Sequence, residues 1–170
     1  MTQGFALFDT AIGRCGIAWG GRGIVGVQLP EGRETETRAR LRRRFPDASE
    51  APPTPVVQRA VDGIVALLAG EARDLSAVGL DMDGVPPFHR RVYEVARTIA
   101  PGRTLSYGEL AARLGAPGSA RAVGQALGRN PFAIVVPCHR VLSGTGLGGF
   151  SGGLEWKQRL LALERVQLFA

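Results

Sequence analysis

A hydrophobic run that ends in Pro137-Cys138-His139 restricts the fold of this chain more than any other feature. Ile134 to Val136 has the composition of a buried strand. Proline has no N–H to donate to a neighbouring strand, so Pro137 ends any strand pairing at this point. We therefore expect a buried strand over residues 134–136 that stops just before Cys138. A thiol at the end of such a strand is rigidly held, as a nucleophile must be.

The residues around Cys138 leave two interpretations open. A free cysteine after an apolar run is commonly a small core side chain without chemistry. Adjacent side chains on an extended chain point to opposite faces, so Cys138 and His139 would not form a direct pair of nucleophile and base. If the thiol is reactive, a turn or a bridging water must connect it to the imidazole.

The charge of the chain favours an anionic partner without identifying one. The formal net charge is +6, and of the 21 basic residues only Lys157 is a lysine. Guanidinium groups match the geometry of phosphates, which is typical of proteins that bind nucleic acids. A preference for arginine over lysine also arises in GC-rich genomes, so charge alone does not decide the partner.

Several classes of protein are disfavoured by composition. No apolar run approaches the roughly 20 residues that cross a bilayer, and no secretory signal is visible at the N-terminus. We therefore expect a cytoplasmic protein without membrane contact. The only cysteines are Cys15 and Cys138, and the only histidines are His89 and His139. Because they form no zinc-binding pattern, we expect neither a metal nor a cofactor.

The first half of the chain has the pattern of a small α/β domain. Residues 3–29 alternate apolar segments with glycine-containing turns, which predicts an antiparallel meander. Residues 35–45 predict an exposed helix whose arginines form a solvated face, and residues 56–68 predict a helix that faces the core. A further strand is expected around residues 78–82. The breaker segment Asp83–Pro87 then predicts a boundary between domains at 1–85 and 86–170.

The second half begins with a predicted helix over residues 88–99 and continues with two short helices. Ser106 and Glu109 fit a capping box that opens a helix over residues 107–114. A turn that contains glycine follows, and we expect Ser119 to cap a second helix over residues 120–128. Two short helices about such a turn predict a helix-turn-helix, although an ordinary helical hairpin has the same pattern.

The second of these short helices is built almost entirely from small residues. They are Ala120, Ala122, Val123, Gly124 and Ala126. Glycine inside a helix costs about 1 kcal/mol relative to alanine, so its presence suggests that close approach of another surface matters. Major-groove helices usually present several polar side chains to the base edges. This helix offers only Arg121 and Gln125, which suits recognition of shape better than reading of sequence.

The segment 130–141, with the glycine-rich loop 144–153 and the helix after it, resembles the active-site block of O6-alkylguanine-DNA alkyltransferases. These DNA-repair proteins move an alkyl group from a damaged base onto their own cysteine. The resemblance covers roughly residues 87–164. It implies an α/β N-terminal domain of ribonuclease H-like fold, with a small antiparallel sheet and helices. It also implies a mostly helical C-terminal domain with a winged-helix-like helix-turn-helix.

The resemblance also implies how the reactive residues divide the work. Cys138 corresponds to the nucleophile, His139 to the base that acts through water, and Glu164 to the carboxylate that orients the histidine. Tyr107 matches the tyrosine that gives a proton or hydrogen bond to the leaving guanine. Asn130 matches the asparagine that braces the helix-turn-helix against the active-site loop.

Further residues match the parts of the family that bind DNA and the damaged base. Double-stranded DNA is expected in contact through its minor groove, with Arg121 filling the space left by a flipped nucleotide and Tyr107 crowding its phosphate. Other expected DNA contacts are Ala120, Ala122 and Gly124. The expected wall of the base pocket contains Val141, Gly148, Phe150 and Ser151, and Phe150 stands where some relatives have tyrosine.

The function implied by the resemblance is repair of O6-alkylguanine, and possible repair of O4-alkylthymine, by one irreversible transfer to Cys138. The protein would act as a monomer and would be consumed. One alternative is an alkyltransferase-like protein that recognises lesions without repairing them, but such relatives replace the cysteine. A cysteine hydrolase and a plain helix-turn-helix regulator are two further candidates, and the Pro-Cys-His block disfavours the regulator.

Overall fold

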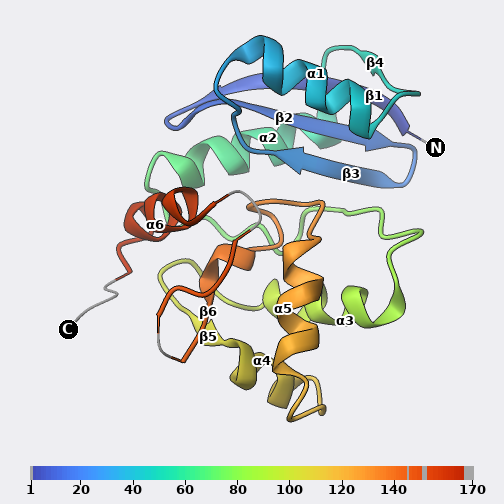
Figure 1. Cartoon of the computed structure of the whole chain (residues 1–170). Helices are drawn as coiled ribbons and strands as arrows, with labels where there is room; N and C mark the ends of the chain where they lie inside the picture. The colour runs from blue at the N-terminus through green and yellow to red at the C-terminus, as the bar shows by residue number, and fades with distance from the viewer. Residues whose placement is uncertain (1, 145, 151–152, 167–170) are drawn as a thin grey trace. The chain divides into compact units, whose positions relative to one another are not determined.

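The computed structural model describes residues 2–144, 146–150 and 153–166. The chain divides into two compact units, one formed by Met1–Asp83 with Pro131–Val135 and the other by Gly84–Asn130 with Val136–Ala170 (Figure 1). The described residues contain six α-helices and a small four-stranded sheet, so the class is mixed α/β.

The sheet of the first unit is the predicted meander with one strand added. Strands β1 (Thr2–Thr10), β2 (Gly13–Gly20) and β3 (Gly23–Gln28) pair antiparallel, and β4 (Ser49–Glu50) pairs parallel to β1. The order across the sheet is β3-β2-β1-β4. The meander predicted over residues 3–29 is therefore confirmed.

Helices α1 (Glu34–Arg44) and α2 (Pro55–Leu68) cover the two faces of this sheet (Figure 1). Leu41 of α1 packs into a buried cluster with Phe5 and Ala18 from the strands. A Cβ at Gly16 would clash with Cδ1 of the same leucine, so a larger residue there would have to displace the Leu41 side chain. The Thr54 side chain accepts a hydrogen bond from the Val57 N–H and caps α2.

The arginines of α1 follow the predicted solvated face except for the last one. Arg38 and Arg42 pair with Glu50 on the surface. Arg44 instead donates hydrogen bonds to the Gln28 side chain and to the backbone carbonyl of Pro131, at 3.2 and 3.1 Å. The helix therefore holds the segment that precedes Cys138 as well as presenting charge to solvent.

The strand expected around residues 78–82 is not formed. Within the described chain its only ladder contact is an isolated bridge between Leu80 and Ile24, supported by hydrogen bonds from Ile24 N to Gly79 O and from Asp81 N to Ile24 O. The backbone approaches closely at this bridge. Gly23 has a φ of +134°, and a Cβ at that position would lie 2.8 Å from the Gly79 oxygen.

The second unit is mostly helical. Its elements are α3 (Pro87–Ala96), β5 (Leu105–Ser106), α4 (Tyr107–Arg113), α5 (Ala120–Gly128), the 3₁₀ turn η1 (Cys138–Arg140), β6 (Val141–Leu142) and α6 (Leu154–Leu163). The short strands β5 and β6 pair parallel to each other. Helix α3 ends three residues before the predicted position, since residues 97–99 form turns.

The two short helices follow the sequence closely, with one difference at a cap. Both hydrogen bonds of the predicted capping box between Ser106 and Glu109 are present. Ser119 occupies the N-cap position of α5 as predicted, but its side chain makes no capping hydrogen bond, because its hydroxyl donates to the Ala116 carbonyl at 2.6 Å and so closes the preceding turn. The bounds of α5 match the predicted helix.

The segment before Cys138 is buried but is not the predicted strand. Ile134 has a φ of +74°, and the Val135 N–H donates to the Ala133 carbonyl at 2.9 Å, which is the pattern of a tight γ-turn. A second turn is centred on Pro137, with φ −81° and ψ 65°, and is closed by the hydrogen bond from Cys138 N to Val136 O at 2.8 Å. Two consecutive tight turns therefore present the cysteine.

No helix in the described ranges is long and apolar enough to cross a membrane.

Candidate active site

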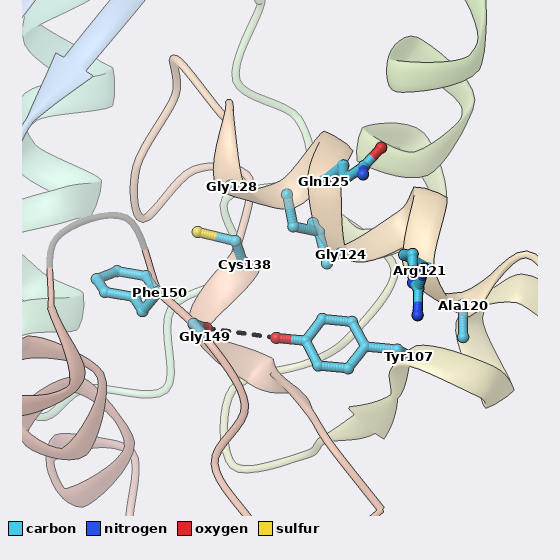
Figure 2. A pocket seen from close by; sticks show the side chains of 10 residues that line it. Tyr107, Ala120, Arg121, Gly124, Gln125, Gly128, Cys138, Gly149 and Phe150 are labelled. Atoms are coloured by element: carbon cyan, nitrogen blue, oxygen red, sulfur yellow. Dashed lines mark hydrogen bonds between the residues drawn. The ribbon is translucent and has the colours of Figure 1, made fainter.

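A mostly apolar cavity of about 630 Å³ lies in the second unit. Its wall is formed by Tyr107, Ala120, Arg121, Gly124, Gln125, Leu127, Gly128, Cys138, Gly149 and Phe150. Figure 2 shows Cys138 and Phe150 toward one end of this group and Arg121 and Ala120 toward the other, with Tyr107 between them. The volume is in the range of cavities that hold small organic ligands.

Cys138 is the only thiol among the residues of this wall, and it is 5% exposed. Its Sγ atom accepts a hydrogen bond from Asn130 Nδ2 at 3.2 Å, and the same amide nitrogen donates to the Val136 carbonyl at 2.9 Å. Burial raises the pKa of the Cys138 thiol. The Asn130 hydrogen bond, the charge of Lys157 and nearby backbone N–H groups act in the opposite direction.

His139 is buried and is held by a carboxylate. Its Nε2 atom lies 2.8 Å from Glu164 Oε2. The other ring nitrogen, Nδ1, is buried without a hydrogen-bond partner in the described part of the chain. Burial lowers the pKa of His139, although the Glu164 carboxylate partly counters this effect. A neutral imidazole whose Nε2 proton points to a carboxylate leaves Nδ1 as a proton acceptor.

Arg140 completes the surroundings of Glu164. Its Nε and Nη2 atoms donate to the two carboxylate oxygens, each at 2.8 Å, and Nη1 donates to the Ile99 carbonyl at 2.6 Å. Burial alone would raise the pKa of Glu164, but hydrogen bonds from His139 and Arg140 outweigh it and lower the value to about 2. Glu164 is therefore ionised over the whole physiological range.

Tyr107 opens α4 and closes one side of the cavity. Its hydroxyl donates to the Gly149 carbonyl at 3.3 Å (Figure 2). Burial raises its pKa, so the phenol keeps its proton. Gly148 has a φ of +72°, and a Cβ there would lie 2.7 Å from the tyrosine hydroxyl, so the glycine-rich loop packs directly on this ring.

Lys157 is a site residue that no sequence pattern indicated. It belongs to α6 and is completely buried, and its Nζ donates to the Val141 carbonyl at 2.7 Å and to the Gly149 carbonyl at 2.8 Å. Nζ also lies 5.7 Å from the centre of the Tyr107 ring. Burial lowers the pKa of Lys157 to about 8. That it is the only lysine in an arginine-rich chain was the one signal visible in the sequence.

Helix α5 supplies the most exposed part of the wall. Arg121 is exposed, and Ala120 and Gly124 line the cavity beside it. A Cβ at Gly124 would meet only the Tyr107 ring at an ordinary 3.8 Å. Packing inside the described chain therefore does not require glycine there, and the predicted approach of another surface stays a prediction.

Not every predicted site residue lies at the cavity. Ala122 is exposed but is not part of the wall, and Val141 is fully buried in β6. Gly148 acts through its contact with Tyr107. Ser151 lies outside the described residues. Among the described residues, no three histidine, cysteine, aspartate or glutamate side chains gather as metal ligands.

Comparisons with known proteins agree with this geometry. Residues 87–166 match the family model described as 6-O-methylguanine DNA methyltransferase, DNA binding domain. A methylated-DNA–protein-cysteine methyltransferase of Mycolicibacterium paratuberculosis is 54% identical over 107 residues. That alignment covers 62% of this chain and 64% of the relative, so the match spans less than two thirds of that protein.

Two longer matches include the first unit as well. A methylated-DNA–protein-cysteine methyltransferase of Methanothermobacter thermautotrophicus is 38% identical over 90% of this chain and 80% of its own length. The crystal structure of Mycobacterium tuberculosis OGT in complex with DNA has a TM-score of 0.77 and 38% identity, covering 95% of this chain and 92% of that one. The chain therefore belongs to the methylated-DNA–protein-cysteine methyltransferase family.

Proposed function

We propose that this protein repairs O6-alkylguanine in DNA by moving the alkyl group onto Sγ of Cys138. The observation that carries the proposal is a thiol on the wall of an apolar cavity, next in sequence to a buried histidine held by Glu164. The relatives whose names describe this reaction support it. They do not favour the alternative of a lesion-recognition protein without repair activity.

The reaction is a displacement at the alkyl carbon. The thiol proton passes through a water to Nδ1 of His139, and Glu164 stabilises the charge that the imidazole gains. The thiolate forms an S–C bond while the C–O6 bond breaks, and the electron pair of that bond stays with guanine. Tyr107 donates to the guanine ring as this negative charge appears. The guanine anion takes up one proton, and the proton that His139 received from the thiol balances it, so the products are a thioether and neutral guanine and no cofactor is required.

The alkylated base reaches the cavity by leaving the DNA stack. Helix α5 approaches the minor groove of double-stranded DNA with Ala120, Ala122 and Gly124, and Arg121 occupies the space left by the flipped nucleotide. Extrusion of a base costs a few kcal/mol, so a side chain that replaces the lost stacking stabilises the flipped state. A relative crystallised with DNA and the exposed position of Arg121 support this arrangement.

The finer architecture is also part of the proposal. An N-terminal domain over residues 1–85 has a ribonuclease H-like fold, which the strand order β3-β2-β1-β4 with a parallel outer strand supports. A C-terminal domain over residues 86–170 carries α4 and α5 as a winged-helix-like helix-turn-helix. The protein works as a monomer in the cytoplasm, with Val141, Phe150 and Ser151 near the base.

Replacing the nucleophile tests the proposed function. Cys138→Ser removes the thiol and leaves a group of similar size, so DNA binding is expected to be retained. Transfer is expected to be abolished, because an alcohol is almost fully protonated near neutral pH. A single-turnover assay with O6-methylguanine in duplex DNA measures transfer, with Cys15→Ser as the matched control. Transfer by the Cys138→Ser variant would mean that another residue is the acceptor.

A further inference from the structure

Lys157 has a more specific environment than a structural lysine needs. It is 0% exposed, although lysine is almost never fully buried without a charged partner. Within the described residues Lys157 donates two hydrogen bonds, both to backbone carbonyls, and forms no ion pair with a carboxylate. Burial of an ammonium group is costly, so a function for the charge is worth seeking.

The Gly149 carbonyl links this lysine to Tyr107. It accepts from Lys157 Nζ at 2.8 Å and from the Tyr107 hydroxyl at 3.3 Å, which uses both of its lone pairs. In the proposed reaction Tyr107 turns its proton toward guanine and leaves Gly149. Lys157 Nζ stays bound to this carbonyl when the hydroxyl leaves, so the loop keeps a side-chain donor at Gly149. Lys157 therefore allows Tyr107 to change partners.

The charge of Lys157 also reaches the nucleophile. Its positive charge lowers the pKa of Cys138, and Cys138 in turn raises the pKa of Lys157. The other titratable groups that interact with these two are Tyr93 and Tyr107, which act on Cys138, and His139, which Lys157 acts on. His139 and Arg140 both bind Glu164, and Lys157 is the cation whose charge lowers the pKa of the Cys138 thiol.

We propose that Lys157 is a positioning residue of the transfer reaction, with two effects of one ammonium group. It keeps the Gly149 and Val141 carbonyls satisfied, so that the Tyr107 hydroxyl is free to donate to guanine, and its charge favours the thiolate of Cys138. This inference rests on the proposed function, because it assigns the step that the lysine assists.

Three substitutions separate the charge from the hydrogen bonds. Lys157→Met removes both, Lys157→Gln keeps a donor without charge, and Lys157→Arg keeps the charge. Arg159→Gln is the matched control, because it removes a positive charge from an exposed position of the same helix. Thermal melting establishes that each variant is folded before it is assayed, and Lys157→Gln serves if the methionine variant does not fold.

The first readout is the pKa of the Cys138 thiol, obtained from the pH dependence of its alkylation by iodoacetamide with peptide mapping. Loss of the charge is expected to raise this pKa and so to reduce the thiolate fraction about tenfold. Lys157→Arg is expected to keep most of the thiolate fraction of the unmodified protein. Arg159→Gln is expected to leave the thiol pKa unchanged. The inference is overturned if Lys157→Gln has the thiol pKa of the unmodified protein.

The second readout is a double-mutant cycle with Tyr107→Phe, measured as the rate of transfer from O6-methylguanine in DNA. If Lys157 acts through Tyr107, its substitution is expected to cost less in the phenylalanine background than in the unmodified protein. If the losses of transfer rate from the Lys157 substitution and from Tyr107→Phe were fully additive, Lys157 would not act through Tyr107. If the unmodified protein transferred no alkyl group while the thiol pKa still responded to Lys157, the proposed function would fail and the electrostatic role would stand.

Discussion

At the level of single residues, buried charge gathers around His139, Arg140 and Glu164. Glu164 accepts from His139 and twice from Arg140, and these side chains are almost fully buried. Breaking a buried ion pair by removing one partner leaves the other charge without compensation, which destabilises a protein more than losing a surface pair. The Glu164 carboxylate therefore stabilises the fold and also holds the His139 imidazole in place.

Glu164→Gln is expected to lower the free energy of unfolding by about 3–5 kcal/mol, since Arg140 loses its buried counter-charge. Urea unfolding at neutral pH measures the change, and Glu155→Gln on the exposed part of the same helix is the control. Equal stability of the two variants would contradict the assigned ion pair.

The pH dependence of stability follows from the same group. The pKa of Glu164 falls from an ordinary 4.5 to about 2 in the folded protein, so the unfolded chain binds more protons between these values. The stabilisation is fully present above about pH 4.5 and is lost as the pH falls toward 2. The free energy of unfolding of Glu164→Gln, measured by urea unfolding, is expected to depend less on pH in this interval than that of the unmodified protein.

The sequence allowed the reactive residues to be predicted unevenly. Cys138, His139 and Glu164 were found because the Pro-Cys-His block resembles a family, and the structure brings the last two within hydrogen-bond distance. Arg140 was not singled out as a site residue, and Lys157 was counted but given no role. A single basic residue has no periodicity or spacing, so its burial and partners become visible only in the folded chain.

At the level of elements, helix α5 is anchored by a buried tyrosine of α3. Tyr93 of α3 is 1% exposed and its hydroxyl donates to the Ala126 carbonyl at 2.6 Å, in the last turn of α5. Asn130, which binds the Cys138 sulfur, follows two residues after this helix ends. The Tyr93 hydrogen bond therefore fixes the C-terminal end of α5, which is the end nearest in sequence to Asn130.

Tyr93→Phe is expected to cost about 1 kcal/mol of stability, because the phenyl ring still fills the core and Ala126 O keeps a hydrogen bond from Arg129 N. Tyr107→Phe is the control, since its hydroxyl lies in a more exposed position. Chemical denaturation would compare the two. If Tyr93→Phe were no less stable than the unmodified protein, the hydroxyl would not anchor α5.

Arg121→Ala tests the part of α5 that lines the cavity. The side chain is exposed, so its loss is expected to leave the fold intact. Transfer from a lesion in duplex DNA is expected to slow, because the flipped state loses a replacement for stacking. Reaction with the free base O6-benzylguanine is expected to change little. Stopped-flow measurements give the rate of transfer from each substrate. Equal losses of rate on both substrates would refute the role of Arg121 in stabilising the flipped nucleotide.

The elements show where sequence patterns succeed and fail. The meander, the capping box at Ser106 and the bounds of α5 came from local signals that the folded chain retains. Residues 134–136 were predicted as a strand because they are apolar, and they are indeed buried. Burial does not require a ladder, however, and two tight turns satisfy the backbone there instead.

At the scale of the whole molecule, the account predicts a protein that is consumed by its own reaction. Each chain carries one Cys138, and a thioether cannot be ionised or released by water. The other thiol, Cys15, is buried in β2, and burial raises its pKa to about 12. Cys15 is therefore not expected to accept a second alkyl group.

Intact mass spectrometry during incubation with excess O6-methylguanine DNA tests this central claim most directly. We expect the mass of each active molecule to rise by one methylene, and the gain to map to the Cys138 peptide. The amount of repaired DNA is expected to stop rising at one equivalent of protein. Doubling the protein should double the plateau. Continued turnover beyond one equivalent, with no gain of mass on Cys138, would contradict the transfer mechanism and indicate a hydrolase.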